Sequence, residues 1–183
     1  IPHVYGDTRN DAMFGVGYVR AADRLWQMES FRAVWRAESA VMLGRGDNDS
    51  NVKADAHTFR LIDYSEAEYQ IMYNRLSTDY GRWGIQAAKD IKAYIGGMNA
   101  YIDLIKREPS KLPIEYTSRD LEPQFWKVTD AMAMAAYSHV AWGSAGSGEE
   151  MNAQLYRQLQ DRFGEDAQAI YNDLRNAPDS ATQ

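Results

Sequence analysis

The 183-residue sequence contains no cysteine. Disulfide bonds, thiolate metal sites and a cysteine nucleophile are therefore excluded for this chain. Its longest apolar run, residues 131–137, is far shorter than the roughly 18 residues that a membrane span requires. The net charge is −6 and the basic residues form no stripe, which argues against nucleic acid as a partner. No charged and apolar leader stands at the start, so any export signal is expected to be absent or already removed.

Few residues have the chemistry of a catalytic centre. The three histidines, His3, His57 and His139, do not follow a metal-ligand spacing, and no serine stands in a G-x-S-x-G motif. His3 follows a proline in an extended segment and is interpreted as structural. His139 lies in an apolar segment and is interpreted as a core histidine, not a base. The residues alone therefore offer no set of nucleophile, base and oxyanion donors.

The composition is that of a globular protein. Hydrophobic residues make up 45% of the chain, which places it among folded sequences. At this length one core of ordinary size is expected. The 5 Trp and 12 Tyr residues are many for the length, and aromatic side chains are common in large protein interfaces. This aromatic content favours the presence of a surface that binds a partner protein.

Hydrophobic periodicity predicts a mostly α-helical chain with a short N-terminal strand. The strand is expected at residues 1–5, where Pro2 confines it to an edge or a strand start. Apolar residues spaced by three and four predict helices at residues 10–44, 54–73, 80–106, 131–142, 149–162 and 166–174. Ser65 and Glu68 form a capping-box pattern that divides the second of these. The fourth is apolar on nearly every side and is expected to be buried all round.

Two pairs of glycines interrupt the predicted helices. Gly15 and Gly17 lie near the start of the first, and Gly96 and Gly97 lie in the middle of the third. A glycine inside a helix costs about 1 kcal/mol relative to alanine. These pairs predict that another backbone packs closely at each site. For the first pair, a helix that begins only near Val16 is the alternative.

Three blocks of the sequence resemble the penicillin acylase family. Residues 1–29 contain IPHVY and GVGYVRAADRLWQME, similar to the family's (G)VPHIYA strand and G-x-GY-x-x-AQDRL-[FW]-QME helix. Residues 94–102, YIGGMNAYI, are similar to Y-x-[ED]-G-[MVI]-N-A-[YW]-I. The connector that ends at Asp130 resembles LP-x-E-[YF]…EPW-x-x-x-D. Two positions depart from these patterns: Ala22 stands where Gln is usual, and Gly96 replaces an acidic residue.

The resemblance implies that residues 1–183 are a single segment, the α subunit of a heterodimeric N-terminal-nucleophile hydrolase with an α+β (αββα) fold. In that family one precursor is cut into two chains, and the catalytic residue is the N-terminal Ser of the longer β chain. The α-amino group of that serine is the base, since an amine with a pKa of about 7.7–8.0 accepts protons at neutral pH. The oxyanion donors also come from the β chain. No catalytic residue is therefore expected here.

The resemblance also implies substrate-binding residues after the connector. The family pattern there, AM-x-x-x-x-x-MANRFSDSTSE-x-x-N, contains a Met, an Arg and a Phe that line the acyl pocket. Aligned on Ala131 and Met132, these positions are Ser138, Ala141 and Trp142. Serine and alanine are smaller than the residues they replace, while tryptophan remains aromatic. We therefore expect a reshaped acyl pocket in which phenylacetyl is not the preferred group.

The same family pattern contains a Glu that binds calcium. Aligned backward from Leu155 and Leu159, this residue is Glu149, and the final Asn of the pattern is Asn152. This alignment differs from the previous one by one residue in the loop between them. A carboxylate is a suitable oxygen ligand for calcium, and the ion would be structural, holding α to β. The alternative is that Glu149 only stabilises the start of a helix through its charge.

These features predict an enzyme subunit. The partner would be a β chain with an N-terminal Ser, the substrate a small N-acyl amide, penicillin-type or related, and the reaction hydrolysis through an acyl-enzyme. The protein is expected in the periplasm or outside the cell, without nucleic acid and without a membrane span. Two alternatives remain open: an N-acyl-homoserine lactone or lipopeptide acylase of the same family, and a non-catalytic helical module that binds a protein partner.

Overall fold

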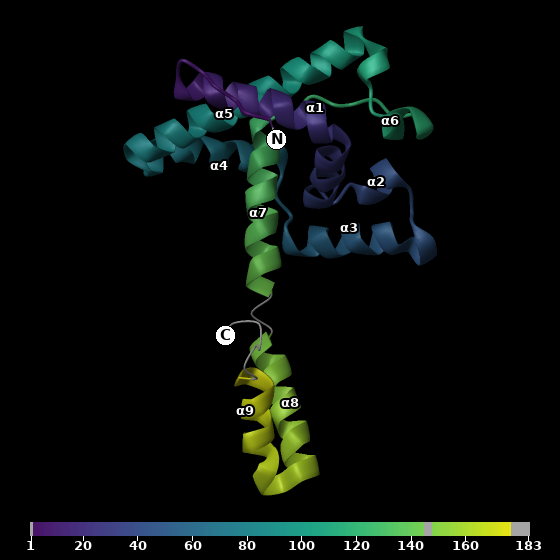
Figure 1. The fold of residues 1–183 in the computed structure, drawn as a ribbon, viewed down its shortest axis with the longest axis vertical. Coiled ribbons are helices and arrows are strands. Elements are labelled where there is room, and N and C mark those ends of the chain that lie inside the picture. The colour runs from purple at the N-terminus through teal and green to yellow at the C-terminus, as the bar shows by residue number, and fades with distance from the viewer. Residues whose placement is uncertain (1, 145–147, 177–183) are drawn as a thin grey trace. The chain divides into compact units, whose positions relative to one another are not determined.

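The computed structural model describes residues 2–144 and 148–176, and this part of the chain consists of helices and loops (Figure 1). The longer helices are α1 (Arg9–Trp35), α3 (Ser50–Leu61), α4 (Glu66–Asp79), α5 (Gly81–Arg107), α7 (Val128–Ser144), α8 (Gly148–Phe163) and α9 (Ala167–Asn176). Two short helices, α2 (Ser39–Leu43) and α6 (Ile114–Ser118), lie in the loops. The predicted mostly helical class is confirmed. The chain forms two compact units, one ending at Val140 and one beginning at Ala141.

The predicted N-terminal strand is not confirmed. Residues 2–6 carry no strand pairing, and the described part of the chain contains no second strand. An extended segment becomes a strand only when a neighbour accepts and donates its backbone hydrogen bonds. Residues 2–6 have no such neighbour within the described part of the chain.

Several helix boundaries differ from the predicted ones. Helix α1 is capped by Thr8, which forms a capping box with Asp11, so the helix begins at Arg9, one residue before the predicted start. The helix ends at Trp35, well before residue 44, because Ala37 adopts a left-handed φ of 56°. Helix α7 begins at Val128, three residues early. The capping box that divides the second predicted helix is confirmed and opens α4.

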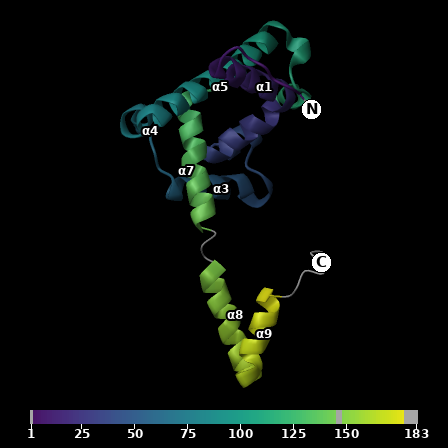
Figure 2. The ribbon, with the colours of Figure 1, turned by 60° about the vertical axis from the view of Figure 1, so that its left-hand side comes forward.

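Helices α1 and α5 cross in both ribbon views (Figures 1 and 2). Two glycines, Gly17 and Gly97, allow the two backbones to approach closely. A Cβ atom on Gly17 would lie 1.9 Å from the carbonyl oxygen of Tyr94, and one on Gly97 would lie 1.9 Å from that of Phe14. No side chain fits between backbones at such distances. The predicted close packing is confirmed for these two glycines, and the alternative start of the helix near residue 16 is wrong.

The main core lies along this crossing. Its buried residues come from α1, α5, α6 and the connector before α7: Ala21, Leu25, Met28, Ile95, Met98, Tyr101, Ile102, Ile105, Tyr116 and Trp126. Each large apolar side chain that is fully removed from water contributes about 1.5–3 kcal/mol. A second cluster, formed by Ile62, Tyr69, Met132 and Ala133, packs α7 against α4 and the segment before it. The two clusters fix where α7 runs within the first unit.

The second unit is a helical hairpin of α8 and α9 (Figure 2). Leu159 and Ala167 are buried between the two helices. The rings of Tyr156 and Tyr171 lie 5.2 Å apart between centroids, and the Tyr156 hydroxyl donates to Gln168 Oε1 at 2.8 Å. These contacts account for the pairing of α8 with α9.

Candidate functional site

A charge network holds the beginning of α7 against α1 and α4. Arg36 Nε donates to Asp130 Oδ1 at 2.9 Å, and its Nη1 donates to Glu66 Oε2 at 2.7 Å. Thr129 Oγ1 donates to the other oxygen of Glu66 at 2.7 Å, and the backbone N–H of Lys127 donates to Asp130 Oδ2 at 2.7 Å. Only 6% of the Asp130 side chain is exposed. A carboxylate this buried is stable only when it is paired and hydrogen-bonded.

Glu66 is ionised in this network. Burial acts to raise the pKa of Glu66, but hydrogen bonds from Thr129 and Arg36 outweigh it, so the pKa lies below its ordinary value. The folded state therefore favours the carboxylate form. The network is complete at neutral pH and weakens in acid.

A second set of polar contacts fixes Trp126, two residues before α7. Asn99 binds both backbone groups of Trp126: its Oδ1 accepts from the N–H at 2.7 Å and its Nδ2 donates to the C=O at 2.8 Å. The indole Nε1 donates to Glu29 Oε1 at 2.9 Å, and the guanidinium of Arg32 lies 4.9 Å from the indole ring. Burial raises the pKa of Glu29, which the charge of Arg32 offsets only in part. The connector is thereby attached to α1 and α5.

The sequence interpretation missed both polar sets. Glu29 ends the QME block and Asn99 lies in the YIGGMNAYI block, but no pairing was expected for either. A signal was present, since Glu29 lies four residues after Leu25 and therefore on the apolar face of α1. A polar residue on a buried face predicts a buried partner, but the partner Trp126 is 97 positions away.

The three predicted substrate-binding residues lie on one face of α7. Ser138, Ala141 and Trp142 are three and four residues apart, which places them on the same side of a helix. Ser138 Oγ donates to the carbonyl oxygen of Met134 one turn earlier, at 2.8 Å. Ala141 is exposed, and 82% of Trp142 is accessible to solvent. Helix α7 is thus not buried all round in this chain, because the opposite face alone packs against α4.

The histidines do not lie in the core. His3, His57 and His139 are all exposed. His139 Nδ1 lies 2.7 Å from the carbonyl oxygen of Ala135 in the preceding turn. The interpretation of His139 as a core residue is wrong, because it lies on the solvent side of α7. In the described part of the chain, no hydrogen bond joins His139 to the side chain of a nucleophile or of another base.

Glu149 lies in the exposed first turn of α8. It borders a hollow of about 410 Å³ within the hairpin, which is also lined by Asn152, Ala153, Tyr156, Gln168 and Tyr171. Residues 2–144 and 148–176 contain no group of three His, Cys, Asp or Glu side chains that could hold a metal ion. Glu149 and Asn152 offer oxygen donors of the kind that calcium binds. Calcium takes six to eight oxygen donors, more than these two side chains supply.

The sequence matches the penicillin amidase family over residues 1–178. The chain belongs to the penicillin amidase family. Among curated members, penicillin G acylase of Escherichia coli is 26% identical over an alignment 183 positions long, which covers 96% of this chain and 19% of that protein. Acyl-homoserine lactone acylase QuiP of Pseudomonas aeruginosa is 29% identical over 136 residues, which are 74% of this chain and 14% of that protein. The chain thus spans a fifth or less of the length of these relatives.

A solved structure supports the same family and the helical arrangement. A chain in the structure of the thermostable penicillin G acylase from Alcaligenes faecalis superposes with a TM-score of 0.67 and 27% identity. The match covers 95% of this chain and 85% of that chain. None of the helices formed by the described residues is both long and apolar enough to cross a membrane.

Proposed function

We propose that this chain is one of the two chains of an N-acyl amide hydrolase, and that the nucleophile is the N-terminal Ser of its partner. One observation carries the proposal. The chain covers 85% of a chain in the solved penicillin G acylase structure but only 19% of the E. coli penicillin G acylase. A short chain of this kind therefore occurs in the structure of a penicillin G acylase. The expectation that the present chain lacks a nucleophile and base of its own agrees with such a division.

The reaction requires only one activated hydroxyl. The serine oxygen bonds to the amide carbonyl carbon, and the α-amino group of the same residue takes the hydroxyl proton and passes it to the leaving nitrogen. The C–N bond breaks and the amine leaves. Water then attacks the resulting ester, releases the carboxylic acid and restores the serine.

The role of this chain is to form one wall of the acyl pocket. The face of α7 that carries Ser138, Ala141 and Trp142 is open to solvent here, and a large exposed aromatic side chain is typical of a surface that a substrate or partner covers. The network of Arg36 and Asp130 holds the start of α7 in place.

The proposal also includes a structural calcium ion and a location outside the cytoplasm. Glu149 and Asn152 would supply two of the oxygen donors of a structural calcium ion at the junction with the partner, and the partner would supply others. The protein would work in the periplasm or after secretion.

Two classes of acyl substrate are compatible with this function. A penicillin-type substrate is supported by the match to penicillin acylases, and an acyl-homoserine lactone by the match to QuiP. The small residues at positions 138 and 141 leave space for an acyl group other than phenylacetyl.

The test is hydrolysis of a panel of phenylacetyl, phenoxyacetyl and fatty-acyl amides and of acyl-homoserine lactones by the complete protein. We expect kcat/KM for a fatty-acyl or phenoxyacetyl substrate to exceed that for phenylacetyl. Trp142→Ala should change the order of preference, whereas Trp83→Ala, which alters another exposed tryptophan, on α5, should leave it unchanged. A strict phenylacetyl preference would refute the reshaped pocket. No hydrolysis of any acyl amide would favour a non-catalytic module.

A further inference from the structure

A groove with a mainly apolar lining lies along the contact of α4 with α7 in the first unit. Its volume is about 460 Å³. Ala135 and Ala136 have short side chains, so the space above them in the groove is left open. The apolar lining contributed by the two helices consists of Met72 and Leu76 of α4 and of Met132, Ala135, Ala136 and Val140 of α7.

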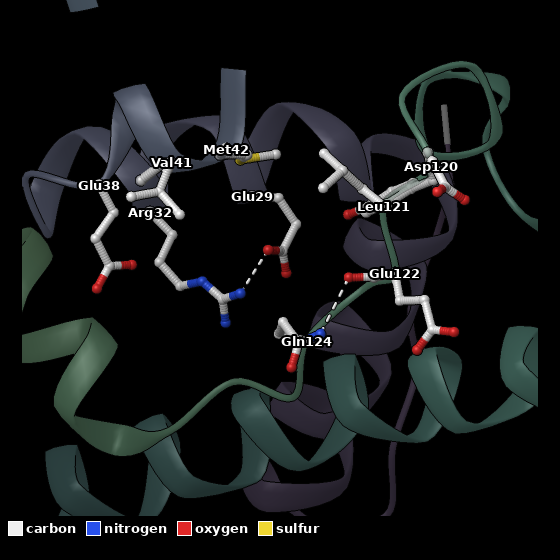
Figure 3. Close-up of a pocket in the computed structure, with 11 residues that line it drawn as sticks. Glu29, Arg32, Glu38, Val41, Met42, Asp120, Leu121, Glu122 and Gln124 are labelled. Atoms are coloured by element: carbon white, nitrogen blue, oxygen red, sulfur yellow. Dashed lines mark hydrogen bonds and ion pairs between the residues drawn. The ribbon is translucent and has the colours of Figure 1, made fainter. Parts of the chain in front are cut away.

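The pocket between α1, α2 and the connector that follows α6 is different in character (Figure 3). Its buried carboxylate, that of Glu29, is already paired with Arg32. The carboxylates of Glu38, Asp120 and Glu122 are exposed and lie apart, so they form no common binding site. The groove of α4 and α7 is therefore the stronger candidate for an interaction surface.

Large exposed side chains border this groove. Leu61, at the end of α3, and Tyr64, between α3 and α4, are each 47% exposed. Tyr80, which follows α4, is 64% exposed. Scattered apolar residues are normal on a protein surface, but several around one apolar recess are typical of an interaction site.

The polar groups of the groove offer no anchor for a charged small molecule. Arg75 is already paired with Asp79, with Nε 2.6 Å from Oδ2. The Nδ1 atom of His139 lies 2.7 Å from the carbonyl oxygen of Ala135. A small-molecule site typically encloses most of its ligand and orients it with a few polar groups. An apolar floor with polar residues at its border is instead typical of a protein interface.

We propose that this groove receives an apolar segment of the longer chain of the hydrolase, which packs aliphatic or aromatic side chains over Ala135 and Ala136. The chain corresponds to only 19% of the E. coli penicillin G acylase, so most of such a protein lies outside it. Ala135 also precedes Ser138 by three residues and is its neighbour on the surface of α7. A chain that covers the acyl pocket at Ser138 is thus adjacent to the groove. The inference rests on the proposed function, since it requires a second chain.

The first test measures how fast the two chains of the complete protein separate in urea, followed by size-exclusion chromatography. Leu61→Asp places a charge in the groove, where an apolar partner segment cannot pair with it, and should raise the separation rate by about tenfold or more. Phe59→Asp is the matched control, because Phe59 is 58% exposed, lies two residues away on another side of α3 and does not line the groove. Both acids lie in the last turn of α3, so their effect on the helix dipole is similar. The control should change the rate by less than about twofold.

The second test identifies the occupant of the groove. The photoreactive residue p-benzoylphenylalanine is introduced in place of Leu61 in the complete protein, and the products of irradiation are identified by mass spectrometry. A cross-link to the longer chain that is absent when Phe59 is replaced in the same way supports the inference. A cross-link to a second copy of the short chain, or none to the longer chain, would refute it.

The outcomes distinguish this inference from the proposed function. Equal separation rates for Leu61→Asp and Phe59→Asp in an active two-chain protein would overturn the inference alone. A higher KM of Leu61→Asp for fatty-acyl substrates, at an unchanged separation rate, would show that the acyl chain of the substrate occupies the groove, which also overturns the inference. An active protein without a second chain would overturn both.

Discussion

The crossing of α1 and α5 gives the sharpest stability prediction, because two adjacent glycines should respond in opposite ways. Gly97→Ala would place a Cβ atom 1.9 Å from the carbonyl oxygen of Phe14 and 2.8 Å from the backbone nitrogen of Tyr18. Gly96→Ala would place its Cβ 3.6 Å from the ring of Phe14, which is ordinary contact. Both substitutions add the same atom to the same helix.

The magnitudes follow from these distances. At Gly97 the Cβ is roughly 1.5 Å too close to a backbone atom for van der Waals contact, so the helices must separate along the main core. Overpacking costs about 1–3 kcal/mol and occasionally more, and a backbone oxygen cannot rotate away, so we expect about 3 kcal/mol. At Gly96 no clash offsets the gain in helix propensity, about 0.5–1 kcal/mol.

The assay is urea unfolding of the complete protein followed by tryptophan fluorescence. The predicted order of unfolding midpoints is Gly96→Ala above wild type and Gly97→Ala below it. Equal midpoints for the two variants, or a Gly97→Ala variant at least as stable as wild type, would refute the close crossing. Activity towards the best substrate reports whether the loss is confined to stability.

Three further predictions concern polar contacts. Asn99→Ala leaves both backbone groups of Trp126 without their partner and should lower the free energy of unfolding by about 2 kcal/mol or more; a loss under about 0.5 kcal/mol would contradict the arrangement. Ser65→Ala removes the cap of α4 and should lower the free energy of unfolding by about 1 kcal/mol. An unchanged free energy of unfolding would mean that another group replaces the cap. Glu66→Gln should lower the urea midpoint at pH 7. The pKa of Glu66 in the folded protein lies below its ordinary 4.5. The difference in midpoint between variant and wild type should therefore vanish as the pH falls through the folded-state pKa. A difference that persists in acid would contradict the ionised state of Glu66.

The features that the sequence predicts well are local ones. Helix periodicity repeats every three or four residues, so the helical class and the capping box at Ser65 could be predicted from neighbouring residues. The close crossing at Gly97 could also be predicted. A glycine inside a helix lowers the helix's stability, and close packing against another backbone is a reason for its presence there. The end of α1 could not, because nothing in its residue type marks Ala37 for a left-handed conformation.

The features that the sequence misses depend on residues far apart in the chain. Arg36 and Asp130 meet only after α1 and α7 have packed, and neither residue type alone specifies the other. The N-terminal strand and full burial of α7 were expected from local residue patterns, which do not say what packs against those residues. Residues 2–6 have no strand partner in the described part of the chain, and Trp142 is exposed. The assignments of Ser138, Ala141, Trp142 and Glu149 remain predictions.

The central claim is that this chain contributes structure and pocket wall to a hydrolase whose nucleophile lies on a second chain. N-terminal sequencing of every chain in an active preparation tests it most directly. We predict a short chain that contains this sequence and a longer one that begins with serine. Activity from a preparation that contains no chain beginning with serine would contradict the claim.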